Sequence, residues 1–217
     1  VSEQLTFLRA ADPKHPVSVV IASSFLSDGF TPAQQERVDF LRDRGVEIIM
    51  MDYYPWGNWI EDSYIPRWEY KIKDGHNFNI VPWAIIQAHL TVSEYMMPTP
   101  EMIRNQTWWC IAARAQGFFY ANPCLYNNAT NRGYLSLDLR PHEDGRFSEI
   151  CDLIPKIKKL KIMLLKARIA DSQETGLEFM GLNGFEENEV EVRFMVEEEK
   201  KKKYMILVNH CLEHPIN

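Results

Sequence analysis

The sequence predicts an α/β protein whose parallel sheet is followed by a small antiparallel β domain. Short apolar runs alternate with helix-length segments up to residue 170, which is the order of βα units. The stretch from Asn79 to Tyr120 has the pattern strand, helix, strand, and a βαβ unit implies a parallel sheet with its functional edge at the carboxyl ends of the strands. After residue 171 the period changes, because charged and apolar residues alternate from Glu189 to Val196 as in an antiparallel strand.

Proline and glycine bound the first two βα units. Pro13 and Pro16 end the first helix, since proline cannot continue it. Pro32 lies near the first turn of the second helix, and Gly45 lies just past its end. The first helix is predicted over Ser2 to Ala11 and the first strand over Val17 to Ala22. The second helix is predicted over Ala33 to Arg44 and the second strand over Val46 to Met51.

The later elements are predicted around a helix that opens with Pro98-Thr99-Pro100-Glu101. The third strand covers Asn79 to Ile86, and this helix covers Pro98 to Ala115. A fourth strand covers Gly117 to Tyr120, and a last helix covers Arg146 to Ala170. The last helix can hold Pro155 only near a first turn or at a kink. A hairpin follows, with strands over Glu189 to Val196 and Tyr204 to Asn209. The loop from Asn58 to Phe78 is of a length that is commonly functional.

Composition and charge exclude several classes of partner. The chain has 217 residues, 46% of them apolar, so it can bury a sizeable core. Its net charge of −6 argues against a nucleic-acid partner, because phosphate binding requires clustered Lys and Arg. No run of about 18 apolar residues is present, so no membrane span is predicted. No signal peptide is visible, and since the chain begins with Val1 we expect the true N-terminus to lie elsewhere.

Two sequons and four cysteines bear on the compartment. Asn105 and Asn128 are followed two residues later by Thr, which favours a glycosylated protein that is secreted or extracellular. The cysteines lack Cys-x-x-Cys spacing, which argues against a structural zinc site. Cys124 and Cys151 can form a disulfide in an oxidising compartment, and other pairings stay open. No metal and no cofactor is predicted.

The number of βα units suggests an incomplete sheet. Four units do not close an eight-stranded barrel, and their parallel strands would leave two long apolar edges. The terminal hairpin lacks the further strands that independent stability requires. We therefore expect the chain to be a piece of a longer protein. The alternatives are a free-standing half-barrel and a half-barrel that completes itself by dimerising.

Several motifs occur in a characteristic order, which carries a family resemblance. They are Asp12-Pro13-Lys14-His15-Pro16-Val17, Ile48 to Pro55, Val81 to Gln87, and Pro98-Thr99-Pro100-Glu101-Met102-Ile103-Arg104 continuing to Ala115-Gln116-Gly117-Phe118-Phe119-Tyr120. Together they resemble the retaining glycoside hydrolases with a (β/α)8 barrel, the beta-galactosidase-like enzymes and their relatives. The resemblance implies that residues 1–170 form the C-terminal half of a TIM barrel, strands five to eight. Residues 171–217 then look like the beginning of the β-sandwich that often follows such barrels.

The same resemblance places the catalytic carboxyl groups. In the family a Glu at the end of strand four is the general acid/base, and here it would lie upstream of the chain. A second Glu, the nucleophile, ends strand seven, and Gln87 occupies that position in this sequence. Retaining hydrolysis needs two carboxyl groups about 5 Å apart, and a neutral amide cannot form the covalent glycosyl ester. An amide can still exchange hydrogen bonds with a sugar hydroxyl.

The candidate site residues follow from the strand ends. Asp52 either accepts a hydrogen bond from a sugar, replaces the missing carboxylate, or orders its own loop. Tyr54 and Trp56 either stack on a sugar or pack within their loop, and Glu94 is a displaced candidate for the nucleophile. His89 is more often a structural residue than a catalyst. The predicted substrate-binding set is Asp52, Tyr54, Trp56, Gln87, His89, Tyr120 and Asn122.

The sequence favours a degenerate, non-hydrolytic glycoside-hydrolase-like domain. Such a domain would bind carbohydrate or act structurally in an extracellular assembly. Its barrel would be completed by the remainder of the parent chain or by another subunit. The alternative is an active glycoside hydrolase whose acid/base lies upstream and whose second carboxylate is Asp52 or Glu94.

Overall fold

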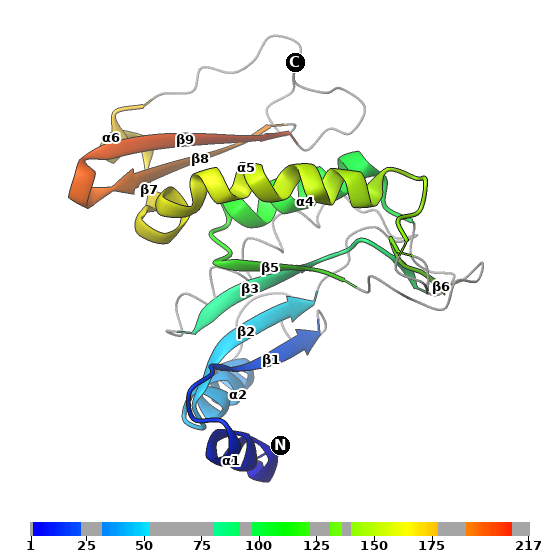
Figure 1. Cartoon of the computed structure of the whole chain (residues 1–217). Coiled ribbons are helices and arrows are strands. Elements are labelled where there is room, and N and C mark those ends of the chain that lie inside the picture. The colour runs from blue at the N-terminus through cyan, green and yellow to red at the C-terminus, as the bar shows by residue number, and fades with distance from the viewer. Residues whose placement is uncertain are drawn as a thin grey trace.

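The computed structural model describes seven stretches of the chain (Figure 1). They are residues 2–22, 32–52, 80–91, 97–121, 131–135, 140–177 and 190–209. Within these stretches the molecule is a mixed α/β protein with a parallel sheet of four strands and an antiparallel sheet of three. No helix in the described stretches has the length and apolar character needed to cross a bilayer.

The parallel sheet confirms the strands and the sheet type predicted for the first part of the chain. Its strands, in spatial order, are β1 (Val17–Ala22), β2 (Val46–Asp52), β3 (Val81–Ile86) and β5 (Gly117–Tyr120). Every neighbouring pair is parallel, so all carboxyl ends lie at one edge of the sheet. Each of these strands is short and rich in Val, Ile or aromatic residues, as buried strands are.

The helices after β1, β3 and β5 share one face of this sheet. They are α2 (Pro32–Arg42), α4 (Pro100–Ala112) and α5 (Arg146–Lys166), while α1 (Ser2–Ala11) precedes β1 and contacts it. The register places Met51, Ala84 and Phe118 side by side on the sheet. All three pack in one apolar cluster that also holds Val38 of α2 and Leu153 of α5. The sheet is therefore covered by helices on one side, as in a singly wound βα sequence.

The opposite face of the sheet is apolar and open. Val20, Met50, Trp83 and Gly117 share this face in the register, with Phe119 two residues further along β5. The ring centroids of Trp83 and Phe119 are 5.4 Å apart. Val20 is 55% exposed and Phe119 is 48% exposed, so large apolar side chains face outward here. In a closed barrel this is the face that points to the barrel axis.

The C-terminal end predicted for the last helix is wrong. We expected it to run to Ala170, but α5 ends at Lys166, and Arg168–Ala170 forms strand β7. Ala167 takes an extended backbone with ψ 140°, and β7 then pairs with β8 (Val190–Glu197). The partners across the sheet supply backbone hydrogen bonds that a helical pattern in the sequence does not reveal. Pro155 lies inside α5.

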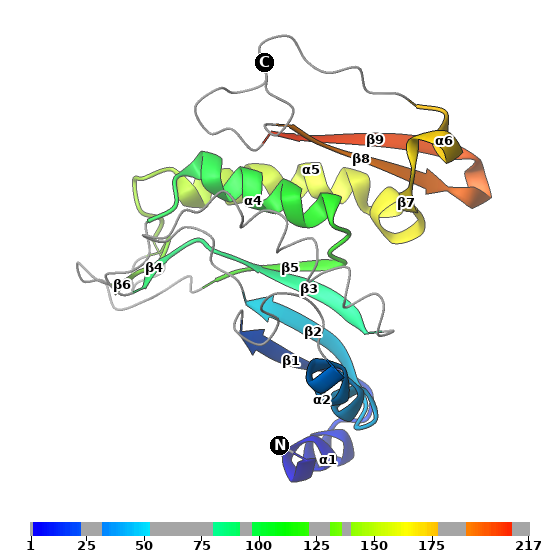
Figure 2. The ribbon, with the colours of Figure 1, turned by 180° about the vertical axis from the view of Figure 1, so that it is seen from behind.

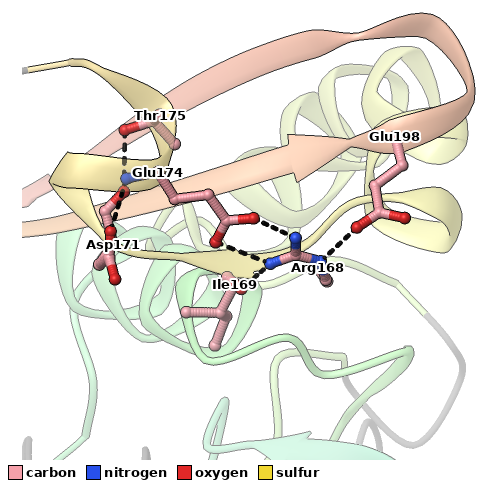
Figure 3. Close-up of polar contacts among 6 residues, drawn as sticks. All are labelled: Arg168, Ile169, Asp171, Glu174, Thr175 and Glu198. Atoms are coloured by element: carbon pink, nitrogen blue, oxygen red, sulfur yellow. Dashed lines mark hydrogen bonds and ion pairs between the residues drawn. The ribbon is translucent and has the colours of Figure 1, made fainter.

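The predicted terminal hairpin is confirmed, and a third strand pairs with it. β8 pairs with β9 (Lys202–Asn209) across a 3₁₀ turn, Glu198–Lys200, and β7 adds to the other side of β8. The expectation that the hairpin lacks further strands is therefore wrong. Figure 3 shows how β7 is held by Arg168, which bonds Glu198 of the turn and Glu174 of the short helix α6 (Ser172–Thr175).

Helices α4 and α5 lie between the two sheets (Figures 1 and 2). Trp109 of α4 packs with Val208 of β9 on the side away from the parallel sheet. Met163 of α5 packs with Met195 of β8. Trp109 is buried and Trp108 is half-buried, so both tryptophans of α4 pack against the rest of the protein.

Candidate functional site at the carboxyl ends of β3 and β5

A cluster of buried polar side chains lies where β3 ends. Gln87 and His89 follow this strand, Gln106 projects from α4, and Arg146 begins α5. The exposed fraction of each of these side chains is 1% or less. Polar groups at this depth are costly unless they are hydrogen-bonded, so the cluster must be held by specific contacts.

Gln87 is bound into the protein at both its backbone and its side chain. Its backbone N–H donates to Oε1 of Gln106 over 3.0 Å. Its side-chain Nε2 donates to the carbonyl oxygen of His89 over 3.4 Å. The amide that stands at the expected nucleophile position is thus a fully buried, hydrogen-bonded group.

Arg146 ties together three segments that are distant in the sequence. Its Nη1 donates to the carbonyl oxygen of Ala88 over 2.5 Å, and its Nη2 donates to that of Gly133 over 2.6 Å. Nη2 also bonds Oδ2 of Asp144 over 2.7 Å, so the buried guanidinium has a carboxylate partner. The planar guanidinium has donors for several acceptors at once, which suits it to this role better than Lys.

His89 is held in its neutral form. Burial, and to a smaller extent the positive charge of Arg146, lower its pKa to about 4. A general acid at neutral pH must carry a proton that it can give up, and an imidazole with this pKa does not. His89 is therefore neutral at neutral pH, and its predicted structural or substrate-binding role stays a prediction.

A second polar contact joins α4 to α5 beside this cluster. Nε of Arg104 bonds Oε1 of Glu149 over 2.8 Å, and Nη2 bonds Oε2 over 2.5 Å. The pair is bidentate, and Glu149 raises the pKa of Arg104 through these bonds. The two helices that cover β3 and β5 are thereby fixed relative to each other.

Tyr120 and Asp52 lie on opposite faces of the sheet. Tyr120 pairs with Ile86 in the register and packs beneath α4, where its Oη is 3.3 Å from Oγ1 of Thr107. Burial raises the pKa of Tyr120 to about 12. Asp52 ends β2, pairs with Ile85 on the open face, and is half-buried. Asp52 therefore lies on the open face of the sheet, and the ring of Tyr120 lies on the face that the helices cover.

Several predicted site residues lie outside the described stretches. They are Tyr54, Trp56, Glu94 and Asn122, together with the sequon at Asn128 and Cys124. Their roles stay predictions. Cys151 is exposed on α5, and because Cys124 lies outside the described stretches, the predicted bond between the two stays a prediction. Cys110 is a buried thiol whose pKa is raised well above its usual value by burial.

The sequon at Asn105 lies within α4. Asn105 is half-buried, whereas Thr107 is completely buried and its Oγ1 donates to the carbonyl oxygen of Ile103 over 2.7 Å. The threonine is thus inaccessible in the folded protein. A glycan on Asn105 would have to be attached before α4 packs.

Sequence reasoning missed Gln106 and Arg146. Gln106 lies three residues after Ile103 and four before Cys110, so a polar residue interrupts an apolar helix face, which is a usable signal. Arg146 gives no such signal, because a basic residue at a helix start is ordinarily exposed. Its role depends on Ala88 and Gly133, which only the fold brings near.

The chemistry of this cluster is that of a hydrogen-bonding scaffold. Its polar groups are two amides, a neutral imidazole and a guanidinium whose carboxylate partner is Asp144. In the described stretches no group of three or more His, Cys, Asp or Glu side chains could hold a metal ion. Two free carboxyl groups about 5 Å apart, as retaining hydrolysis requires, are not part of the cluster around Gln87 in this described part of the chain.

No protein-family model matches the sequence, and no curated protein matches it. The function of this chain is therefore inferred from its own residues.

Proposed function

We propose that this chain is the half of a glycoside-hydrolase-like (β/α)8 barrel that carries strands five to eight, and that it binds carbohydrate without hydrolysing it. The single observation that supports this best is Gln87. A neutral amide stands where the resemblance expects a nucleophilic carboxylate, and its Nε2 donates to the carbonyl oxygen of His89, while the backbone N–H of Gln87 donates to Gln106. Such a group cannot attack an anomeric carbon.

The open face of the parallel sheet supports completion of the barrel by further βα units. β1 and β5 are the edge strands among the described residues, and helices cover one face only. Exposed apolar side chains occur on the open face and on the helices at both edges, including Phe7 of α1 at 71% and Leu165 of α5 at 57%. Exposed apolar area of this extent marks an interaction surface. The remainder of the parent chain or another subunit would cover it.

Asp52 is the residue through which we expect sugar to bind. It ends β2 at the carboxyl edge of the sheet and faces the open side, where a barrel places its ligands. A carboxylate there can accept hydrogen bonds from sugar hydroxyls. The sequons further favour a secreted or extracellular protein, in which such binding would take place.

The test measures hydrolysis and binding on the same native protein. A panel of aryl glycosides should show no turnover above buffer, while titration calorimetry with oligosaccharides should show saturable binding. Asp52→Asn should weaken this binding about tenfold, the effect of losing about 1.4 kcal/mol. Asp43→Asn is the matched control, because this exposed carboxyl group precedes β2 at the opposite edge of the sheet.

The alternative function, active hydrolysis, is favoured by the same position of Asp52. If the native protein cleaves aryl glycosides and Asp52→Asn or Glu94→Gln abolishes cleavage, that residue is the second carboxylate and our proposal is overturned. If the native protein shows no turnover and no carbohydrate binding, our proposal is also overturned. A structural role in an assembly would then remain.

A further inference from the structure

His89 and Arg146 place two basic side chains in one buried region beyond the carboxyl end of β3. The side chain of His89 is 1% exposed, and that of Arg146 is completely buried. The two are also linked along the chain, because Nη1 of Arg146 donates to the carbonyl oxygen of Ala88, the residue before His89. A proton on the imidazole would therefore add a second positive charge to a region that already encloses one, which is costly away from water.

The same arginine holds a small sheet in place at this end of the molecule. The sheet consists of β4 (Leu90–Thr91) and β6 (Asn131–Arg132), which pair antiparallel over two residues each (Figure 2). Arg146 donates to the carbonyl oxygen of Gly133, directly after β6, as well as to that of Ala88 before β4. A pair of strands this short is not stable alone, so its position depends on these bonds.

The charged and titratable groups around the cluster offer little compensation for a charged imidazole. Asp144, just before α5, bonds Nη2 of Arg146 over 2.7 Å. Glu149 of α5 is bound by both nitrogens of Arg104 that face it from α4. Tyr120 of β5 stays neutral, because burial raises its pKa to about 12. These two carboxylates are thus already paired with guanidinium groups, and the charge of Arg146 opposes protonation of the imidazole.

Residues 87–91 and 131–133 share these contacts, and we name them together the latch. We infer that protonation of His89 opens the latch in mildly acidic solution, while the two larger sheets stay folded. An open latch lets the charged imidazole reach water, so acid shifts the population toward it. Few bonds are lost on opening, chiefly those from Arg146 and those between β4 and β6, so the latch opens at a lower cost in free energy than the sheets do.

Opening of the latch would change the carboxyl edge of the parallel sheet. Gln87 is its first residue, and both the bond from its backbone to Gln106 and the bond from its side chain to the His89 carbonyl would break. Ile85, two residues earlier, pairs with Asp52 of β2. The latch therefore adjoins the edge at which we propose that carbohydrate binds. Such a switch would act on this edge whether or not carbohydrate binds there, so the two proposals can fail separately.

Hydrogen exchange with mass spectrometry at pH 7 and pH 5 tests the switch on the native protein. The pKa of His89 is about 4 in the closed latch and takes its ordinary value of 6.5 in the open one. The ratio of open to closed latch should then rise about twentyfold between these pH values. After correction for the pH dependence of intrinsic exchange, amide protection in the latch should fall by this factor, and protection in β2, β8 and β9 should not change. Constant protection in the latch, or an equal loss in β2, would overturn the inference.

Two variants identify the group that responds to acid. His89→Gln should keep its protection in the latch at pH 5, because glutamine does not titrate. His142→Gln is the matched control, since this half-buried histidine lies in the segment before α5 and its backbone N–H donates to the carbonyl oxygen of Tyr134. It should lose protection at pH 5 as the native protein does. An acid response that persists in His89→Gln, or that disappears in His142→Gln, would overturn the inference.

The pH at which protection begins to fall gives a second readout that needs no change at His89. Carboxyl groups have ordinary pKa values of about 4, whereas a histidine in an open latch binds its proton near pH 6.5. A series of exchange measurements in steps from pH 7.5 to pH 5 should show protection of the latch falling from about pH 6.5 downward. If His89→Gln does not fold, this series and His142→Gln still decide the question. A loss that begins only below about pH 5 would assign the response to a carboxyl group such as Asp144 and overturn the inference.

Discussion

Gly117 is a residue whose identity is required by close packing. A Cβ built at this position would lie 2.5 Å from Cε2 of Trp83, far inside van der Waals contact. The indole of Trp83 lies over the backbone of the neighbouring strand and contacts the ring of Phe119. Only a residue without a side chain lets this tryptophan cross from β3 over β5.

Gly117→Ala should therefore destabilise the protein by about 1–3 kcal/mol, the usual cost of overpacking. Urea unfolding followed by tryptophan fluorescence measures the change. In the double variant with Trp83→Leu the alanine should cost much less, because the obstructing ring is gone. Additive effects of the two substitutions would show that the clash is not the cause.

His89 makes stability depend on pH in the mildly acidic range. The unfolded chain binds a proton at this residue near pH 6.5, while in the fold burial and Arg146 lower the pKa to about 4. The unfolded state thus binds more protons between these values, so stability falls as the pH drops from 6.5 to 4. The loss from this residue reaches at most about 3–4 kcal/mol, from about 1.36 kcal/mol for each unit of pKa.

The prediction is checked by urea unfolding at pH 7 and pH 4.5 for the native protein and two variants. His89→Gln should reduce the loss of stability on acidification, since glutamine does not titrate. His15→Gln, at an exposed histidine, should leave that loss in place. An unchanged pH dependence in His89→Gln would disprove the assignment.

At the scale of elements, α4 begins where the sequence places a cap. Thr99 is the N-cap residue, and its Oγ1 accepts a hydrogen bond from the backbone N–H of Met102 over 3.3 Å. Pro100 occupies the first turn, where its missing N–H costs nothing. The motif Pro98-Thr99-Pro100-Glu101 thus acts as a helix start, as predicted.

Thr99→Ala should reduce the free energy of unfolding by about 1 kcal/mol, because the N–H of Met102 loses its acceptor. Thr99→Ser keeps a hydroxyl group and should restore most of the stability. Chemical denaturation of the three proteins side by side measures this. A serine variant as unstable as the alanine variant would rule out capping as the reason.

Strand β7 depends on a charged cluster at the end of the antiparallel sheet (Figure 3). Arg168 bonds both carboxylate oxygens of Glu174, and its Nε bonds Oε1 of Glu198 over 2.8 Å. Asp171 caps α6 by accepting from the backbone N–H of Glu174 over 2.7 Å. The bonds from Arg168 lower the pKa of Glu174. The cluster is exposed, so its effect is expected to be local.

Arg168→Ala should speed amide exchange in residues 168–170 without changing exchange in β2 and β3. Exposed ion pairs contribute little to global stability, but the pairing of a three-residue strand can loosen alone. Hydrogen exchange with mass spectrometry detects this. Lys158→Ala serves as the control, because this exposed lysine forms no hydrogen bond or ion pair with β7 in the described stretches. Uniformly faster exchange over both sheets would contradict a local role.

For the whole molecule, the open sheet face predicts a larger native particle. We expect the mass of the native protein, after enzymatic removal of N-glycans, to exceed 25.4 kDa, or the particle to be an oligomer at that chain mass. Native mass spectrometry before and after glycan removal decides this. A deglycosylated monomer of 25.4 kDa would end the barrel hypothesis. A decrease in the measured mass when N-glycans are removed would establish that the protein passes through the secretory pathway.

The elements whose bounds were predicted correctly are those whose signals lie in the local sequence. The runs Val17–Ala22 and Gly117–Tyr120 are strands with the predicted bounds, and α1 also has its predicted bounds, Ser2–Ala11. Hydrophobic periodicity, proline and capping residues act within a few positions, so they can be read without knowing the fold. Strand and helix order then implied the parallel sheet, because βα units alternate that way.

Tertiary structure decided what depends on residues that are far apart in the chain. Arg168–Ala170 continues a helical pattern, yet it is a strand because β8 supplies its hydrogen-bonding partners. Gln87 could be placed at the end of β3 from sequence, but its burial depends on Gln106 of α4. Arg146 is buried because Ala88 and Gly133 converge on it. Long-range contacts of this kind are formed only when the elements pack, and the sequence alone carries no local signal for them.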